Sequence, residues 1–184
     1  MGFAKFPQRP VSRAKSYWRW SLIFDSVERF IVGTVGLPGE RAFFLQVRQS
    51  GKLATVAVEK SQVAALTERL EMLISQLRKS GHAIGLNLLE RDDKPLEQPI
   101  EADFVVGAIS ISWSEDGNHV EIELLDVEQE SQQGWNLFLS LEMANAFVKR
   151  ARAVIESGRL PCPLCGLPID PQGHLCPRAN GYKR

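Results

Sequence analysis

The sequence lacks three features that would each have assigned it to a broad class of protein: a long apolar run, a strong net charge and a cysteine set suited to disulfides. No apolar run approaches the length of about eighteen residues that a membrane-spanning helix needs, so no membrane insertion is expected. The formal net charge is zero, with 22 basic and 22 acidic residues, so no overall field points to nucleic acid or membrane. Only 3 of 184 residues are cysteines, and an odd number does not suit a disulfide framework. We therefore expect a cytoplasmic protein.

Catalytic motifs are also absent. The chain has no P-loop, no dinucleotide-binding glycine motif, no His-Glu-x-x-His and no Gly-x-Ser-x-Gly. Residues 33–39 are glycine-rich, but no lysine and hydroxyl follow at P-loop spacing, so we expect a turn between two strands. His82 and His119 are expected to be exposed loop residues. Glu121 and Glu123 share one strand face, for which a solvated surface is simpler than a carboxylate pair. The residues thus indicate no catalytic constellation.

All three cysteines lie near the C-terminus together with one histidine. Cys162, Cys165, His174 and Cys176 follow the spacing C-x2-C-x8-H-x-C. Thiolates and imidazole are ligands that tetrahedral zinc prefers, and four protein ligands close its coordination sphere, as in structural sites. The spacing therefore predicts a structural zinc knuckle in the tail, residues 159–184. A C-x-x-C redox pair and a tail without metal are the alternatives.

The charges are unevenly placed along the chain. Residues 1–20 contain five basic residues and no acidic one, interleaved with aromatic residues. Such a segment can contact nucleic acid or an anionic lipid surface. No apolar core typical of a secretory signal precedes a cleavage site. We favour a disordered N-terminal arm over residues 1–22, or an upstream start codon in the gene.

The middle of the chain has the pattern of a duplication. Phe-Ile-Val-Gly at 30–33 matches Phe-Val-Val-Gly at 104–107, and each opens a β-patterned block that ends in an amphipathic helix. The expected strands are 42–47, 53–58, 109–113, 120–125 and 135–141, with turns near 50–51 and 115–118. The expected helices begin at an N-cap on Ser61 and at Met143.

These elements predict an α+β fold. Two repeated β-meander-plus-helix units, residues 23–80 and 100–158, are expected to pack into a core over residues 23–158. Residues 81–99, with two prolines and a run of charges, are the expected linker.

Four polar residues, Arg29, Arg41, Gln46 and Lys60, are the candidates for a ligand site in a groove between the two units. Arginines in a groove between the units would suit a phosphate or carboxylate. Structural ion pairs are the competing interpretation.

Several segments resemble one protein family. They are residues 28–36, 41–46, 58–63 and 96–100 and, most specifically, CPLCG at 162–166 with GHLCPRANGY at 173–182. These residues are similar to the domain of unknown function 3090 family, uncharacterised and mainly actinobacterial proteins. The resemblance runs from about residue 23 to the C-terminus and offers no catalytic residue. It implies a link to a phosphorylation-related pathway, because family members are said to occur beside a histidine-phosphatase-like and a kinase-like protein.

These observations predict a non-catalytic, zinc-containing binding or regulatory module of the cytoplasm with a protein partner of unknown identity. A nucleic-acid-binding zinc-knuckle protein is one alternative. An enzyme acting on a phosphorylated substrate is the other.

Overall fold

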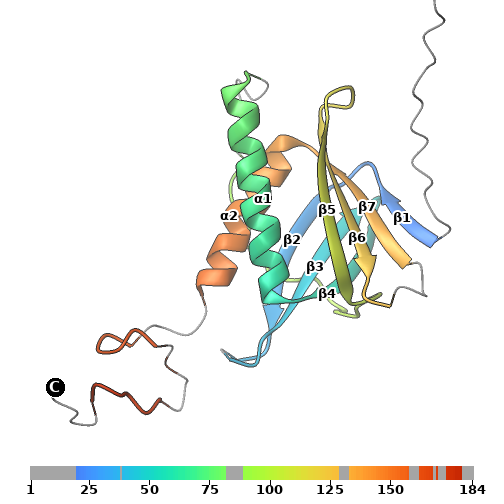
Figure 1. The fold of residues 1–184 in the computed structure, drawn as a ribbon. Helices are drawn as coiled ribbons and strands as arrows, with labels where there is room; N and C mark the ends of the chain where they lie inside the picture. The colour runs from blue at the N-terminus through green and yellow to red at the C-terminus, as the bar shows by residue number, and fades with distance from the viewer. Residues whose placement is uncertain are drawn as a thin grey trace, which may run out of the picture.

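A computed structural model describes residues 20–37, 39–81, 89–128, 133–157, 162–167, 169 and 173–179. The elements run in the order β1 (Trp20–Phe24), β2 (Arg29–Val35), β3 (Ala42–Gln49), β4 (Lys52–Val58), α1 (Lys60–Lys79), β5 (Val106–Ser114), β6 (His119–Asp126), β7 (Gln133–Leu139) and α2 (Leu141–Glu156). Figure 1 shows the two helices packed side by side, next to the strands. The predicted α+β class is confirmed. Within the described residues, no helix is long and apolar enough to cross a membrane.

The strands form two sheets. Sheet A has the order β1-β7-β6-β5, and sheet B has the order β2-β3-β4. Each contains an antiparallel meander, β5-β6-β7 in sheet A and β2-β3-β4 in sheet B, and one helix follows each meander along the chain. Strand β1 adds to sheet A in parallel to β7, with Trp20 opposite Gln133. It begins inside the segment predicted as an arm, and residues 1–19 lie outside the described residues.

Tight turns close the meanders where the sequence predicts them. Ser50 and Gly51 join β3 to β4 with φ values of 50° and 74°. Two consecutive positive φ angles are typical of a two-residue hairpin turn whose twist matches that of the strands. Asn118, with φ 48°, closes the turn between β5 and β6. Of the glycine-rich segment 33–39, residues 33–35 belong to β2 and the turn begins only after them, where the Glu40 N–H donates to the Leu37 carbonyl at 3.0 Å.

The start of α1 differs from the prediction. The N-cap is Glu59, not Ser61, because the Val63 N–H already donates to the Glu59 carbonyl at 3.0 Å. Gln62 fixes this start, since its side chain accepts the Glu59 N–H at 2.9 Å. Helix α2 likewise begins at Leu141, within the predicted last strand, because Ser140 accepts the Met143 N–H at 3.2 Å as N-cap.

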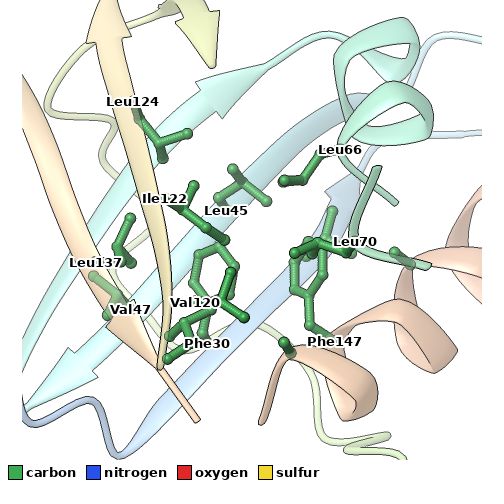
Figure 2. Packing of buried hydrophobic residues seen from close by; sticks show 14 of the residues in the cluster. Phe30, Leu45, Val47, Leu66, Leu70, Val120, Ile122, Leu124, Leu137 and Phe147 are labelled. Carbon is green, nitrogen blue, oxygen red and sulfur yellow. The ribbon is translucent and has the colours of Figure 1, made fainter. Parts of the chain in front are cut away.

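One hydrophobic core lies between the sheets and the helices. Figure 2 shows side chains from both sheets and both helices directed into the same space, among them Leu45, Ile122, Leu66 and Phe147. Phe30 of β2 stacks on Phe147 of α2 with ring centroids 4.6 Å apart. Burial of this shared apolar surface holds the two meanders and their helices together.

Residues 89–105, here called the strap, cross the opposite face of sheet B and end at the edge of β4. Leu96 lies against Gly33 of β2 on that face. Nearer the end of the strap, the Asp103 N–H donates to the Thr55 carbonyl at 2.7 Å and the Ala57 N–H donates to the Phe104 carbonyl at 3.0 Å, along the edge of β4. The described part of the predicted linker, residues 89–99, therefore lies against sheet B.

We expect Gly33→Ala to loosen the strap. A Cβ atom at Gly33 would lie 2.5 Å from Cγ of Leu96, which is too close for two carbon atoms. The cost should be about 1–3 kcal/mol of unfolding free energy, the usual range for an added methyl group in a packed interface. Urea unfolding measures it.

The double variant Gly33→Ala/Leu96→Ala is the control for that clash. If the clash is the cause, the double variant should be less destabilised than the sum of the two single variants. Simple additivity would contradict this explanation.

Candidate metal centre

A tight turn brings the first two cysteines of the tail together. The Gly166 N–H donates to the Cys162 carbonyl at 2.8 Å, and the Cys162 N–H donates to the Leu167 carbonyl at 2.7 Å. Gly166 has φ 76°, a left-handed conformation that glycine adopts without steric cost. The chain therefore reverses directly after Cys165, and both thiols point to the same side.

The second pair of candidate ligands approaches from a separate turn. Gly173 has φ 90° just before His174, and the Ala179 N–H donates to the Cys176 carbonyl at 3.1 Å. The Arg178 guanidinium joins the two turns, since its Nη1 donates to the Leu164 carbonyl at 2.9 Å. The tail thus holds both halves of the site with hydrogen bonds of its own.

The four donor atoms form one cluster. The Sγ atoms of Cys162, Cys165 and Cys176 and a ring nitrogen of His174 all lie within 4.8 Å of one another. Sγ of Cys162 is 3.8 Å from Sγ of Cys176, and Sγ of Cys165 is 3.2 Å from Nε2 of His174. Two thiolates bound to zinc at tetrahedral angles are about 3.8 Å apart. The predicted set of ligands is therefore brought together at a spacing that fits a metal ion.

The local environment distinguishes the two thiols of the first turn. The backbone N–H groups of Cys165 and Leu164 lower the pKa of the Cys162 thiol below its ordinary value of 9.0. Desolvation raises the pKa of the Cys165 thiol. Cys162 and Cys176 are each 7% exposed, and none of the three cysteines forms a disulfide. The four donors could hold a metal ion, with the thiols of Cys162 and Cys176 shielded from solvent and that of Cys165 partly exposed.

Comparison with known families matches residues 22–176 to the family described as Protein of unknown function (DUF3090). The chain belongs to this family. The match begins in β1 and ends at Cys176, so it includes all four candidate ligands of this DUF3090 protein and leaves residues 1–21 outside. No curated protein and no solved structure matches the chain.

Two of the four residues predicted as a ligand site meet at the strap. Gln46 is 1% exposed, and its amide donates to the Glu97 carbonyl at 2.9 Å and accepts the Glu97 N–H at 2.9 Å. Arg29 pairs with the carboxylates of Asp92 at 2.5 Å and Glu97 at 3.1 Å. Both side chains bind protein groups, and their use by a ligand stays a prediction.

The other two residues of that set lie elsewhere. Arg41 donates to the carbonyl and hydroxyl oxygens of Ser157, at 2.9 and 3.0 Å, and so ties the start of β3 to the end of α2. Lys60 is exposed at the first position of α1. The four residues therefore do not form one cluster.

Arg150 was not singled out by the sequence. It is 7% exposed on α2, and its Nε donates to the Val32 carbonyl at 2.6 Å. Its Nη1 donates to the carbonyls of Asp92 and of Lys94, the latter at 2.7 Å. Arg150 therefore joins α2, the open edge of β2 and the strap. The sequence signal for Arg150 was a charged residue at a position of α2 where the apolar pattern predicts a buried side chain.

The residues considered for catalysis have structural partners. Glu121 and Glu123 accept hydrogen bonds from Ser112 at 3.1 Å and Ser110 at 3.2 Å, across the β5–β6 pair. His119 was expected in an exposed loop, but it begins β6 and is half-buried against Phe138, with ring centroids 5.0 Å apart. The ring packs there because β7 pairs with β6 on that side. His82 lies outside the described residues.

Asp92 should make the stability of the strap depend on pH. Hydrogen bonds from Arg29 hold the pKa of the Asp92 carboxyl below its ordinary value of 3.8, and burial opposes them. Because the folded pKa is below the unfolded one, the stabilisation is complete above the unfolded pKa and is lost as the pH falls through the folded pKa.

The difference in unfolding free energy between the wild type and Asp92→Asn should therefore be largest above about pH 4 and shrink below it. Urea unfolding between neutral and acidic pH measures this difference. Asp93→Asn is the matched control, because Asp93 forms an exposed ion pair with Arg91. A difference for Asp92→Asn that stays constant across this pH range would contradict the assignment.

Proposed function

We propose that this DUF3090 protein is a non-catalytic, zinc-containing binding module whose metal-bound tail contacts a protein partner. The main support is the set of four donor atoms within 4.8 Å. Four protein ligands leave no coordination position for water or substrate, so a metal held by them stabilises structure instead of catalysing a reaction.

The surface of the tail supports a role in binding. Leu164, Leu167 and Leu175 are 53%, 49% and 88% exposed, and each lies within two positions of a candidate ligand. Exposed apolar side chains held on a rigid turn are suited to a protein interface. We propose that these leucines contact the partner.

Other parts of the proposal rest on the sequence. Zinc is proposed because three thiolates and one imidazole suit it, and the cytoplasm because the cysteines are arranged for metal and not for disulfides. We also propose that the two meander-plus-helix units are repeats, which their common element order supports. The link to a phosphorylation-related pathway stays a prediction from the resemblance.

Native mass spectrometry of the intact, untagged protein purified from its own cells tests the proposal. We expect one zinc ion per chain and a co-purifying protein. Leu164→Ser/Leu175→Ser should keep the zinc and lose the partner. Leu22→Ser/Met72→Ser is the control, since it removes similarly exposed apolar side chains from β1 and α1.

Two results would contradict the proposal. A metal-free chain with two oxidised cysteines would favour redox chemistry at the C-x-x-C pair. Bound nucleic acid whose affinity falls steeply with salt would favour the nucleic-acid alternative.

A further inference from the structure

Two stretches of this chain each lack charges of one sign. Residues 95–148, which include β5, β6 and β7, contain 11 acidic residues and no lysine or arginine. Residues 1–19 contain five lysines and arginines and no acidic residue. The segment directly precedes β1, and β1 belongs to sheet A together with β6, the strand of that sheet that carries Glu121, Glu123 and Asp126.

The outer face of sheet A is the surface on which part of this negative charge is displayed. Val120, Ile122 and Leu124 of β6 point into the core, so Glu121 and Glu123, which alternate with them, lie on the opposite face. Ser110 and Ser112 of β5 are exposed beside the two carboxylates. In Figure 1 helix α1 lies beside β5, at the edge of sheet A away from β1.

Apolar side chains border the carboxylates on this face. In the strand register, Glu123 lies opposite Asn136, and Asn136 lies opposite Ile23, which is 51% exposed. Glu121 lies opposite the half-buried Phe138. A segment that carries both cations and aromatic rings, as residues 1–19 do, complements a face of this composition.

The position of β1 brings residues 1–19 within reach of this face. Trp20 lies opposite Gln133 of β7. Ile23, three residues later in β1, lies opposite Asn136, which in turn lies opposite Glu123 of β6. Two strand spacings and three residues of rise separate Trp20 from Glu123, a distance of about 14 Å. The five residues from Lys15 to Trp20 can span about 17 Å. Lys15 can therefore reach Glu123.

We propose that residues 1–19 dock on the outer face of sheet A, with their lysines and arginines against Glu121 and Glu123. This intramolecular contact goes beyond the proposed function, because neither the metal nor the tail takes part in it. Residues 1–19 would thereby compete with cationic segments of other proteins for that face.

Zero-length carbodiimide crosslinking of the full-length monomer tests the proposal, because this reagent joins a lysine amine to a carboxylate only where the two touch. We expect crosslinks from Lys15 or Lys5 to Glu121 or Glu123, identified by mass spectrometry of the digested monomer band. Their yield should fall several-fold in 1 M salt, where charges are screened within about 3 Å.

Glu121→Gln/Glu123→Gln should abolish these crosslinks and should speed trypsin cleavage at Arg9, Arg13, Lys15 and Arg19. The control Glu40→Gln/Glu68→Gln removes two exposed carboxylates elsewhere and should change neither readout. Urea midpoints of both variants show whether the fold is kept.

Three results would overturn the proposal. The first is the absence of crosslinks between the arm and sheet A at low salt. The second is crosslinks found only in a covalent dimer, which would place the arm on a second copy of the chain. The third is a trypsin cleavage rate in Glu121→Gln/Glu123→Gln equal to that of the wild type.

Discussion

Replacing Arg150 with methionine should lower the free energy of unfolding by about 3 kcal/mol, the range in which removing one partner of a buried ionic contact falls. The guanidinium is 7% exposed and donates to the backbone carbonyls of Val32, Asp92 and Lys94. Methionine fills much of the same space but donates no hydrogen bond, so these carbonyls lose their donor. Equilibrium urea unfolding of the two proteins measures the difference.

Arg152→Met is the matched control on the same helix. Arg152 pairs with Glu71 across the helix pair, but 53% of its side chain is exposed. Exposed ion pairs contribute about 0–1 kcal/mol, so this variant should be close to the wild type. Equal destabilisation by the two substitutions would show that Arg150 has no special role at the strap.

If the proposed zinc assignment is right, Cys165→Ser should reduce the bound zinc from one ion per chain to almost none and should unfold the tail. Apparent binding free energies of structural zinc are about 10–16 kcal/mol, and in small metal-bound segments this binding free energy also stabilises the folded state. The expected effect is therefore larger than that of any other substitution proposed for this chain. Metal analysis and limited proteolysis of residues 159–184 measure the two consequences.

The core should be unaffected by the loss of metal. Four hydrogen bonds of the tail, those of Cys162, Gly166, Ala179 and Arg178, each join residues within the tail. The urea midpoint of the core should thus be the same in Cys165→Ser and in the wild type. Leu164→Ser, which changes the exposed neighbour of Cys165, should keep the zinc. Zinc retained by Cys165→Ser would refute the assignment of the ligands.

The features that the sequence predicts well are local ones. The hairpin turn at Ser50 and Gly51 depends on the conformational preferences of two residues. The metal cluster depends on spacings of two and eight residues in one short segment, and the structure brings the same four residues within 4.8 Å. Alternating apolar residues likewise located β3, β4, β5 and β6 to within a few residues.

The strap could not be predicted in this way. Its contacts join Leu96 to Gly33 and Asp92 to Arg150, residues that lie more than fifty positions apart. A segment with two prolines and a run of charges has the composition of a solvated linker, and composition does not reveal that these charges have partners. Only the fold shows that Arg29 and Arg150 converge on Asp92.

Local sequence patterns also could not predict that β1 pairs in parallel with β7. Trp20–Phe24 is a short segment after a basic stretch, and its partner β7 lies more than a hundred residues later. Periodicity identifies a strand but not its neighbour in the sheet. The same holds for His119, whose packing against Phe138 depends on the β6–β7 register.

The attachment of the strap to Arg150 also bears on how this chain is made. The strap emerges from the ribosome after Arg29 and Gln46, which contact it from sheet B, but before Arg150, which contacts it from α2. It can therefore lie on sheet B during synthesis, as nascent domains commonly fold from the N-terminus onward, but it lacks its contacts with α2 until that helix follows. A nascent chain arrested before α2 would consequently hold the strap by its contacts with sheet B alone, and completion of α2 would add those of Arg150.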